Sequence, residues 1–306
     1  MKRHFVVAMA MALCVPFLSL HLSAQGFGFR LKLSGGYAHL GNGDPNTLLD
    51  ASHSFLVNIG TFLAEVYALP TEIAGEAKKI SKGGAEFGGE AIVTYGRFGF
   101  GLGLENLGGR SAKSDWTLSS IDSPEYPLIS RIDGKFDTLA LTANLYMFFG
   151  KSPLGFYVFA GPGLYFGKAS WDYLFQDDML SLEGYFEDQS INVKAHGFGA
   201  QGGLGIEYDL TPQVGLFAEG KVRACKLKDW NGDEVWETAL GGPFTWSGKL
   251  WYYEFYDWMY GTGGWYPYAD IFETGTSPSG EYARNARAFE IDLTGFSLRA
   301  GIRIRF

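Results

Sequence analysis

The C-terminal segment alternates strictly between apolar and polar positions and ends on an aromatic residue. From Phe296 to Phe306 every even-numbered residue is apolar, while the odd-numbered residues are serine, glycine and three arginines. Because successive side chains of a β-strand point to opposite faces, such a strand separates two media across one sheet. In an exported β-sandwich the apolar face packs on a second sheet. In a membrane barrel it meets lipid, and the arginines need acidic partners in the lumen.

The N-terminus has the pattern of a secretory signal peptide. Two basic residues precede an apolar stretch at residues 5–18, and small residues before Gln25 form a cleavage site. We therefore expect residues 1–24 to be removed and the mature chain to start at Gln25. Its one cysteine, Cys225, cannot form an internal disulfide, so the exported fold must be stable without one.

Composition favours a barrel over a helical membrane protein. Glycine accounts for 43 of 306 residues and aromatic residues for 16%, and this density of glycine does not suit helices. Beyond the signal peptide no apolar stretch approaches the roughly 20 residues that a membrane helix needs. Only helices and closed barrels satisfy their backbone polar groups in lipid, so the alternating chain indicates a barrel. A net charge of -8 argues against nucleic acid as a partner.

Eight stretches have the two-residue period of a β-strand, and their connections alternate in length. They are residues 27–40, 86–97, 98–107, 136–149, 156–168, 195–210, 214–226 and 289–306. Four long connections lie at about 41–85, 108–135, 169–194 and 227–288. The pattern predicts an all-β fold: a transmembrane, antiparallel, up-and-down barrel of eight strands over residues 25–306, with extracellular long loops and periplasmic termini.

Aromatic residues fall at both ends of the predicted strands, as in the girdles of membrane barrels. We expect one rim to contain Tyr95, Phe98, Phe149, Phe156, Tyr208 and Phe306. The other rim is expected to contain Tyr37, Phe198, Trp230 and Phe289. A soluble sandwich, the alternative fold, would not need apolar outer faces that end in aromatic residues on both rims.

The last eight residues combine a polar residue, a glycine and terminal hydrophobic residues, at Arg299, Gly301, Ile304 and Phe306. This octet is similar to the β-signal read by the barrel-assembly machinery. With the glycine-rich segments 160–167 and 202–219, it resembles the small eight-stranded outer-membrane barrels of the OmpA, OmpX and OmpW type. The resemblance implies insertion into the outer membrane of a Gram-negative bacterium, in contact with lipid and lipopolysaccharide. It implies architecture rather than activity, because this fold carries many functions.

Twelve charged residues take inward positions on the predicted strands. They are Arg30, Lys32, Lys221, Arg223, Arg299, Arg303 and Arg305, with Glu90, Glu105, Glu207, Asp209 and Glu219. An eight-stranded lumen is just wide enough for side chains to fill, and unpaired buried charge is costly, so we expect a hydrogen-bonded ionic network. Two interpretations stay open: a plug that sets register and closes the barrel, or a gated path for ions.

Three of the long connections contain distinctive segments. Residues 46–69 have apolar residues at helical spacing between two prolines, which predicts an amphipathic helix that caps the barrel, lies on lipid or binds an oily ligand. The third connection is acidic, with Asp172, Asp177, Asp178, Glu183, Glu187 and Asp188, although its spacing matches no known calcium loop. The fourth is rich in tyrosine and tryptophan, and its candidate contact residues are Trp251, Tyr253, Tyr256, Trp258 and Trp265.

Support for catalysis is thin, and we predict that the protein is not an enzyme. The histidines of the mature chain are His39, His53 and His196, and His196 lacks the serine two residues later that a barrel deacylase would have. A lone cysteine in a barrel, such as Cys225, usually only packs. The sequence therefore favours a structural or surface-recognition role through aromatic loops, with an extracellular glycan or protein as ligand and no cofactor. The alternative is a narrow channel for ions or small hydrophobic molecules; a lipid-modifying enzyme ranks below both.

Overall fold

The computed structural model describes residues 26–41, 43–179, 184–257, 263–273 and 276–306, so the predicted signal peptide lies outside the described residues. Within these ranges the chain forms one helix and fifteen strands: β1 (Phe27–Leu40), α2 (Asp44–Tyr67), β2 (Thr71–Lys78), β3 (Gly83–Tyr95), β4 (Phe98–Asn106), β5 (Arg110–Ser120), β6 (Leu128–Lys151), β7 (Leu154–Asp177), β8 (Tyr185–Asp209), β9 (Val214–Leu227), β10 (Asn231–Thr238), β11 (Gly241–Tyr256), β12 (Trp265–Phe272), β13 (Ala283–Ala288), β14 (Ile291–Asp292) and β15 (Gly295–Arg305). All strand pairings are antiparallel, which confirms the predicted all-β antiparallel fold. The described part of the chain contains no helix that could cross a membrane.

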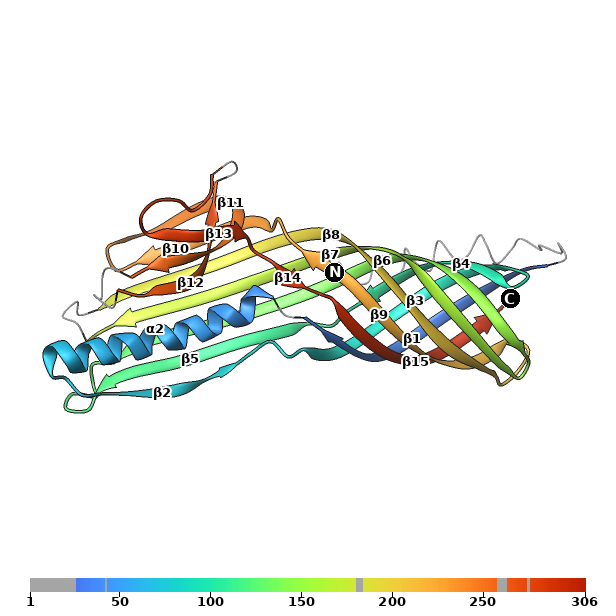
Figure 1. Ribbon diagram of the computed structural model, residues 1–306, viewed down its shortest axis with the longest axis horizontal. Coiled ribbons are helices and arrows are strands. Elements are labelled where there is room, and N and C mark those ends of the chain that lie inside the picture. Colours follow the sequence, from blue (N-terminus) through green and yellow to red (C-terminus); the bar gives the residue numbers. More distant parts are fainter. Residues whose placement is uncertain (1–25, 42, 180–183, 258–262, 274–275) are drawn as a thin grey trace.

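A ring of strand pairings closes one half of the elongated molecule into a barrel. Starting from β1, the strands pair in the order β1, β3, β4, β6, β7, β8, β9 and β15, and β15 pairs with β1 again. The strands of this half cross the long axis obliquely (Figure 1), and the C-terminus lies at the end of the barrel farthest from α2. The interior of this ring is called the lumen below.

The sheet does not stop at the ring, which differs from the prediction of a clean eight-stranded barrel. Strands β6, β7 and β8 have 24, 24 and 25 residues and run past the ring along the whole molecule. Their outer segments are residues 128–136, 168–177 and 185–194. The outer segment of β6 pairs with β5, that of β8 pairs with β10, and that of β7 lies between these two. Together with α2, β2, β5 and β10–β13 they form what we call the distal half.

Segments predicted to be long loops are therefore mostly strands. In residues 128–136, the charged Arg131, Asp133 and Lys135 alternate with buried residues such as Ile132 and Phe136. Charged residues take the outward positions there, so the segment looks polar although it keeps the two-residue period of a strand. A polar outward face is what a strand shows to water, and in the sequence it resembles a loop.

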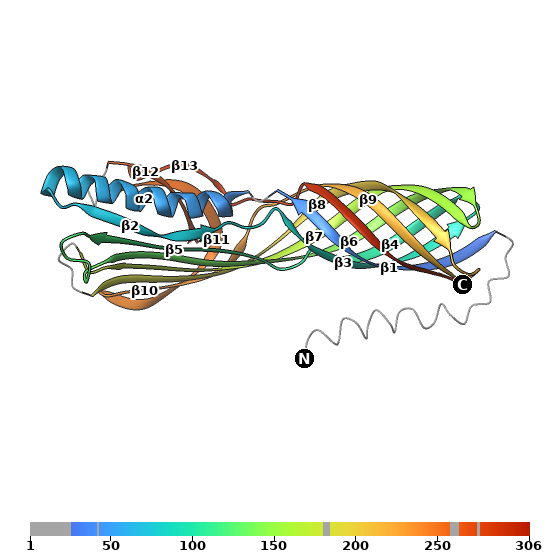
Figure 2. The same cartoon turned by 90° about the horizontal axis from the view of Figure 1, so that it is seen from below.

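Helix α2 covers one side of the distal half. It begins at Asp44, where Pro45 suits the first turn of a helix, and ends before Ala68, which adopts a left-handed conformation. Its buried face includes Leu56, Ile59 and Leu63, which pack with residues of β5, β6 and β7. Figure 2 shows the helix alongside β2 and β5, at the end of the molecule away from the barrel.

The outer surface of the ring carries a belt of exposed apolar side chains. Phe198 is 80% exposed and Leu145 69%, and the belt also includes Leu33, Val93, Phe100, Leu102, Leu141, Val158, Leu204, Val222, Leu298 and Ile302. The predicted rim residues Tyr95, Phe98, Phe149, Phe156, Tyr208, Phe306, Tyr37 and Phe198 are all exposed. Apolar patches of this extent are rare on soluble monomers and mark a surface that meets an apolar partner.

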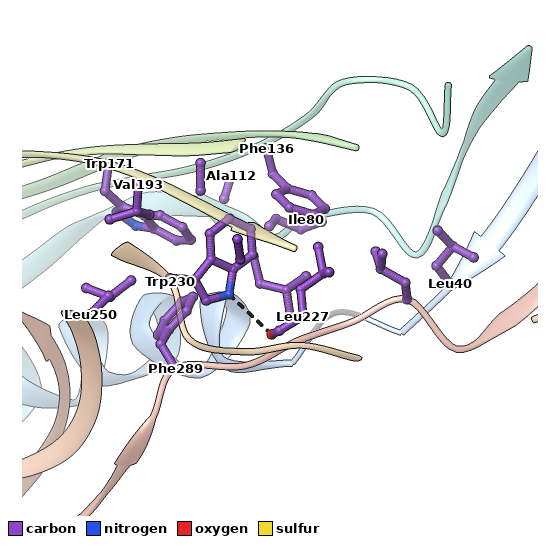
Figure 3. Packing of buried hydrophobic residues seen from close by; sticks show 14 of the residues in the cluster. Leu40, Ile80, Ala112, Phe136, Trp171, Val193, Leu227, Trp230, Leu250 and Phe289 are labelled. Atoms are coloured by element: carbon purple, nitrogen blue, oxygen red, sulfur yellow. Dashed lines mark hydrogen bonds between the residues drawn. The ribbon is translucent and has the colours of Figure 1, made fainter. Parts of the chain in front are cut away.

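Two of the predicted rim residues lie inside the molecule instead. Trp230 and Phe289 are both 0% exposed, and they pack with Leu40, Ile80, Phe136 and Leu227 where the barrel meets the distal half (Figure 3). β9 ends at Leu227, and Asp229 adopts a left-handed conformation with φ 54° before β10 begins, so the alternation of β9 no longer fixes the direction of the Trp230 side chain. We call these six residues the junction cluster.

Candidate functional site

The lumen is filled by ion pairs that follow one another along the barrel axis. Near the C-terminal end, Arg303 Nη1 lies 3.0 Å and Arg30 Nη1 3.1 Å from Glu207 Oε2. Arg305 Nη1 lies 3.1 Å from Asp209 Oδ2, so each acid of this level faces at least one guanidinium group. These ion pairs link β1, β8 and β15. Because β1 is the first and β15 the last strand of the ring, the pairs connect the two ends of the chain that forms the barrel.

The middle level of the lumen is centred on Glu219. Its Oε2 lies 2.7 Å from Lys32 Nζ and accepts a hydrogen bond of 2.7 Å from the Tyr157 hydroxyl, while Arg299 Nε pairs with its Oε1. Arg299 also reaches Glu105, with Nη1 2.9 Å from Oε1. One arginine thus links two carboxylates on different strands.

The third level contains an acid that the sequence prediction missed. Lys221 Nζ lies 2.8 Å from Glu86 Oε1 and 2.7 Å from Glu105 Oε2, and Arg223 Nη2 lies within 3.3 Å of both acids. The predicted strand starts only at Glu86, whereas β3 begins at Gly83 and carries Glu86 well inside its length. Its spacing of four residues from Glu90 puts it on the same face, which is the signal that could have found it.

Glu90 has neutral partners rather than a cation. It accepts hydrogen bonds of 2.9 Å from Asn144 Nδ2 and 2.5 Å from the Tyr146 hydroxyl, and Gln201 donates to Asn144 at 3.1 Å. Sequence reasoning missed these amide and phenol groups, because charge alone does not distinguish them from other polar residues. The structure brings all twelve predicted residues into one lumen.

Glycines opposite the large side chains make room for them in the lumen. A Cβ atom on Gly101 would lie 2.4 Å from Glu90 Oε1, and one on Gly205 would lie 2.2 Å from Tyr157 Cζ. Contacts below 3 Å are not tolerated, so a side chain at either position would displace a lumen group. The high glycine content thus follows from packing as well as from strand geometry.

The junction cluster separates the ionic lumen from the distal half. The indole of Trp230 packs edge-on against Phe136, with ring centroids 5.8 Å apart, and its Nε1 donates to the Leu227 carbonyl at 3.2 Å. Gly167 lies directly against this ring, because a Cβ atom there would be 2.5 Å from the indole. Figure 3 shows the packed apolar side chains of the junction cluster.

A cavity of about 790 Å³ lies in the distal half, beyond this cluster. Helix α2 contributes Leu48, Ser52 and Phe55, and the outer segments of β7 and β8 contribute the residues from Trp171 to Phe175 and from Tyr185 to Ile191 that face inward. Strands β10, β11 and β12 supply the remaining wall. The volume is in the range of pockets that hold small organic molecules, and such pockets combine apolar walls with a few polar groups.

The polar centre of the cavity is a pair of acids on β10 and β12. Glu234 accepts hydrogen bonds from Gln189 Nε2 at 2.6 Å and from the Ile271 backbone N–H at 3.1 Å. Asp270 lies beside it, and burial, with the hydrogen bond and negative charge of Glu234, raises the pKa of Asp270 to about 9. The Tyr268 hydroxyl donates to Gln189 at 3.2 Å, and burial together with Asp270 raises the pKa of Tyr268 as well.

The five aromatic contact candidates do not form one surface. Tyr253 is buried and lines the cavity. Trp251 lies under Lys249, whose Nζ is 5.0 Å from the ring centroid, and Tyr256 packs on Trp265 with centroids 5.1 Å apart. Trp258 lies outside the described residues. Sequence reasoning missed Tyr173 of β7 as an aromatic wall residue, because it lies far from this segment in the chain.

The predicted assembly-signal residues lie at the seam of the barrel. Arg299 points into the lumen, and Gly301 faces Ser34 of β1 in the register of β1 and β15. Ile304 pairs with Leu31, and Phe306 is exposed at the barrel end. Their contact with the assembly machinery stays a prediction.

The acidic third connection does not gather its carboxylates. Asp177 is buried and accepts a 3.0 Å hydrogen bond from the Met179 backbone N–H, Asp172 accepts one of 2.9 Å from Ser190 Oγ, and Glu183 lies outside the described residues. Glu187 accepts a hydrogen bond from Tyr185. In the described ranges no group of three or more histidine, cysteine or acidic residues could hold a metal ion.

The residues considered for catalysis have packing contacts. His39 stacks on Phe296 with centroids 5.2 Å apart, and His53 lies 4.4 Å from the Trp116 ring centre. His196 is exposed on β8, and Cys225 is buried in the apolar cluster that contains Trp230. The prediction that the protein is not an enzyme stays a prediction.

No protein-family model matches the sequence, and no curated protein matches it. Solved structures with similar folds include OprG from Pseudomonas aeruginosa, with 11% identity over 92% of this chain and 96% of that chain and a TM-score of 0.38. A major outer membrane protein from Thermus thermophilus has 14% identity, coverage of 92% and 99%, and a TM-score of 0.34. The attachment invasion locus protein Ail of Yersinia pestis has 12% identity, coverage of 90% of this chain and 99% of that chain, and a TM-score of 0.30. Similarity at this level says nothing about the function of this chain, and the narrower resemblance to the OmpA, OmpX and OmpW type stays a prediction.

Proposed function

We propose that the protein is an integral outer-membrane barrel that captures a small hydrophobic molecule in the cavity of its distal half. The ring of eight strands, β1, β3, β4, β6, β7, β8, β9 and β15, would span the membrane. The distal half would stand outside the cell, and both ends of the ring sequence would face the periplasm. The observation that carries the proposal is the cavity of about 790 Å³, closed below by the junction cluster.

Membrane insertion is supported by the contrast between the two faces of the ring. Its outer face carries the apolar belt, with Leu204 and Val222 among the most exposed side chains, while its charges point into the lumen. In water this arrangement would expose a large apolar area, whereas in a bilayer the same area would contact lipid. The closed ring leaves no unpaired strand edge in the bilayer.

The aromatic-rich segment then acts as a wall rather than as an open contact surface. Tyr253 and Phe255 of β11 and Tyr266 and Tyr268 of β12 all line the cavity. This shifts the predicted recognition role from a glycan or protein bound on loops to a small ligand bound inside. A glycan or protein would have to bind through the residues that remain outside, such as Trp265.

The alternative of a narrow channel is less well supported. Three levels of ion pairs fill the lumen, and the junction cluster adds an apolar layer above them. Removing one partner of a buried pair leaves a costly unpaired charge, so the network resists opening. We therefore assign the lumen a structural role as a plug.

A fluorescent dye tests the proposed function. N-phenyl-1-naphthylamine, a neutral apolar dye that brightens in apolar surroundings, would be titrated into the refolded chain in lipid nanodiscs. Ala51 lines the cavity from α2, and Val57 is exposed on the same helix. We expect Ala51→Trp to place an indole in the cavity and weaken saturable dye binding by roughly tenfold or more, which corresponds to about 1.4 kcal/mol. Val57→Trp should leave it unchanged, and equal binding by the two variants would refute the proposal.

A further inference from the structure

The charged residues that line the cavity all have the same sign. They are Glu187, Glu234, Asp257, Asp270 and Glu273, and the described lining residues include no lysine, arginine or histidine. The lumen differs, because there Glu86, Glu105, Glu207, Asp209 and Glu219 each meet a lysine or an arginine. The cavity is thus an acidic compartment without protein cations of its own.

Glu234 and Asp270 form the most enclosed part of this compartment. Glu234 is 2% exposed, and the donors that hold it are neutral: the Gln189 amide and the Ile271 backbone N–H. Asp270 accepts from the same Ile271 N–H at 2.7 Å. Buried carboxylates normally pair with cations, because neutral donors do not cancel their charge. A pair without a cation has room for one that comes from outside.

The walls around the two acids suit a cation that carries apolar groups. Tyr253 packs edge-on against both Tyr268 and Phe272, with centroids 5.8 and 5.9 Å apart, and Trp236 lines the same cavity. Aromatic faces attract cations through their quadrupole, most strongly where water is excluded. Other wall residues, such as Leu48 and Ile132, offer apolar contacts.

We propose that the cavity selects a hydrophobic organic cation, an amine whose ammonium group lies against Glu234 and Asp270 while its apolar part lies between the aromatic walls. This rests on the proposed function, since it names the ligand class of the same cavity. The raised pKa of Asp270 agrees with it, because a proton held by the pair takes the place of the cation when the cavity is empty. Cation and proton would then compete for one position.

Three naphthalene compounds of matched size test this selectivity. They are 2-naphthylmethylamine, a cation at neutral pH; 2-naphthylmethanol, which is neutral; and 2-naphthoic acid, an anion. Each would compete with N-phenyl-1-naphthylamine on the refolded chain in nanodiscs of zwitterionic lipid, so that the lipid does not attract the amine. We expect the amine to bind at least roughly tenfold more tightly than the alcohol, and the acid to bind most weakly.

Matched variants connect the selectivity to the two acids. Glu234→Gln and Asp270→Asn keep the shape of the side chains and remove the carboxylates, and each should reduce the preference for amine over alcohol. Asp233→Asn is the control, because Asp233 is the neighbour of Glu234 on the exposed face of β10. Heat-dependent gel migration confirms that each variant is folded.

The outcomes separate the two proposals. Amine and alcohol binding equally to the parent protein would overturn the cation selectivity while leaving a hydrophobic-ligand cavity in place. A preference that persists in the Glu234→Gln, Asp270→Asn double variant would overturn the assignment to these acids. Failure of the dye itself to bind saturably would refute the proposed function as well.

Discussion

Trp230 shows how one side chain can join two parts of a barrel protein. It comes from the segment between β9 and β10, yet its ring fills the space between β6 and β7 and the Phe289 side chain. Its alternation with neighbouring residues resembles that of a lipid-facing rim residue. The direction of the side chain depends on where the chain turns after Leu227, and no local pattern encodes that turn.

We predict that Trp230→Ala lowers the free energy of unfolding by roughly 3–5 kcal/mol, because a fully buried tryptophan leaves a large cavity when it is truncated. Urea unfolding of the refolded protein in lipid, followed by gel migration, measures the change. Phe244→Ala, at an exposed position of β11, serves as the control and should cost much less. A loss of similar size in the two variants would show that Trp230 is not part of a core.

Asp270 makes the distal half sensitive to pH. Its pKa is raised from 3.8 to about 9, so between these values the folded protein binds a proton that the unfolded chain has released. Stability should therefore decrease as pH rises through this window. Asp270→Asn, which mimics the protonated acid, should flatten the decrease and raise the urea midpoint at about pH 8.5 relative to about pH 5. Tryptophan fluorescence reports the midpoint, and an identical pH profile in parent and variant would contradict the shift.

At the scale of elements, helix α2 is held at its N-terminus by the segment just before β15. Asp44 in its first turn accepts hydrogen bonds of 2.6 Å from Arg287 Nη1 and 2.7 Å from the Glu290 backbone N–H. An acid in the first turn also interacts favourably with the helix dipole. In the sequence, Asp44 is 243 residues from Arg287 and 246 residues from Glu290. Contacts between distant parts of the chain therefore fix where α2, which forms one wall of the cavity, begins.

We predict that Asp44→Ala loosens the first turns of α2 and costs roughly 1–3 kcal/mol, because a nearly buried acceptor of charged and backbone donors is lost. Hydrogen–deuterium exchange of residues 44–52 should become faster. Asp50→Ala is the matched control on the same helix, since its ion pair with Lys79 is exposed on both sides and contributes little. Equal exchange in both variants would show that the N-terminal contacts do not hold the helix.

The elements also show what sequence can predict. β1 spans the predicted residues 27–40, and α2 begins two residues before the predicted 46. Periodicity sufficed for both, because each has one apolar face over its whole length. The predicted strands are shorter than β6 to β8. The outward face of these strands is apolar in the ring but carries charged residues in the outer segments, so the apolar pattern ends before the strand does. The cavity could not be predicted, because Glu234 and Asp270 come together only when β10, β11 and β12 fold against α2.

At the scale of the whole molecule, the lumen network and the junction cluster should keep the barrel closed to ions. We predict that the refolded chain produces no discrete openings in a planar bilayer, once heat-dependent gel migration has confirmed folding. The ion pairs around Glu207 and Arg299 occupy the space that a pore would need. Reproducible unitary currents that change when Arg299 or Glu207 is neutralised would instead identify the lumen as a channel.

The continuity of β7 and β8 has a consequence for assembly. Their pairing runs without a break from Leu154 opposite Tyr208 to Asp177 opposite Tyr185. A slip of one residue would turn every side chain of the moved strand to the opposite face. If β8 slipped, Glu207 would point away from the lumen and, in the same event, Gln189 and Ile191 of β8 would turn away from the cavity. The two halves are therefore coupled in assembly, because a chain with β8 misaligned loses ion pairs of the lumen and walls of the cavity together.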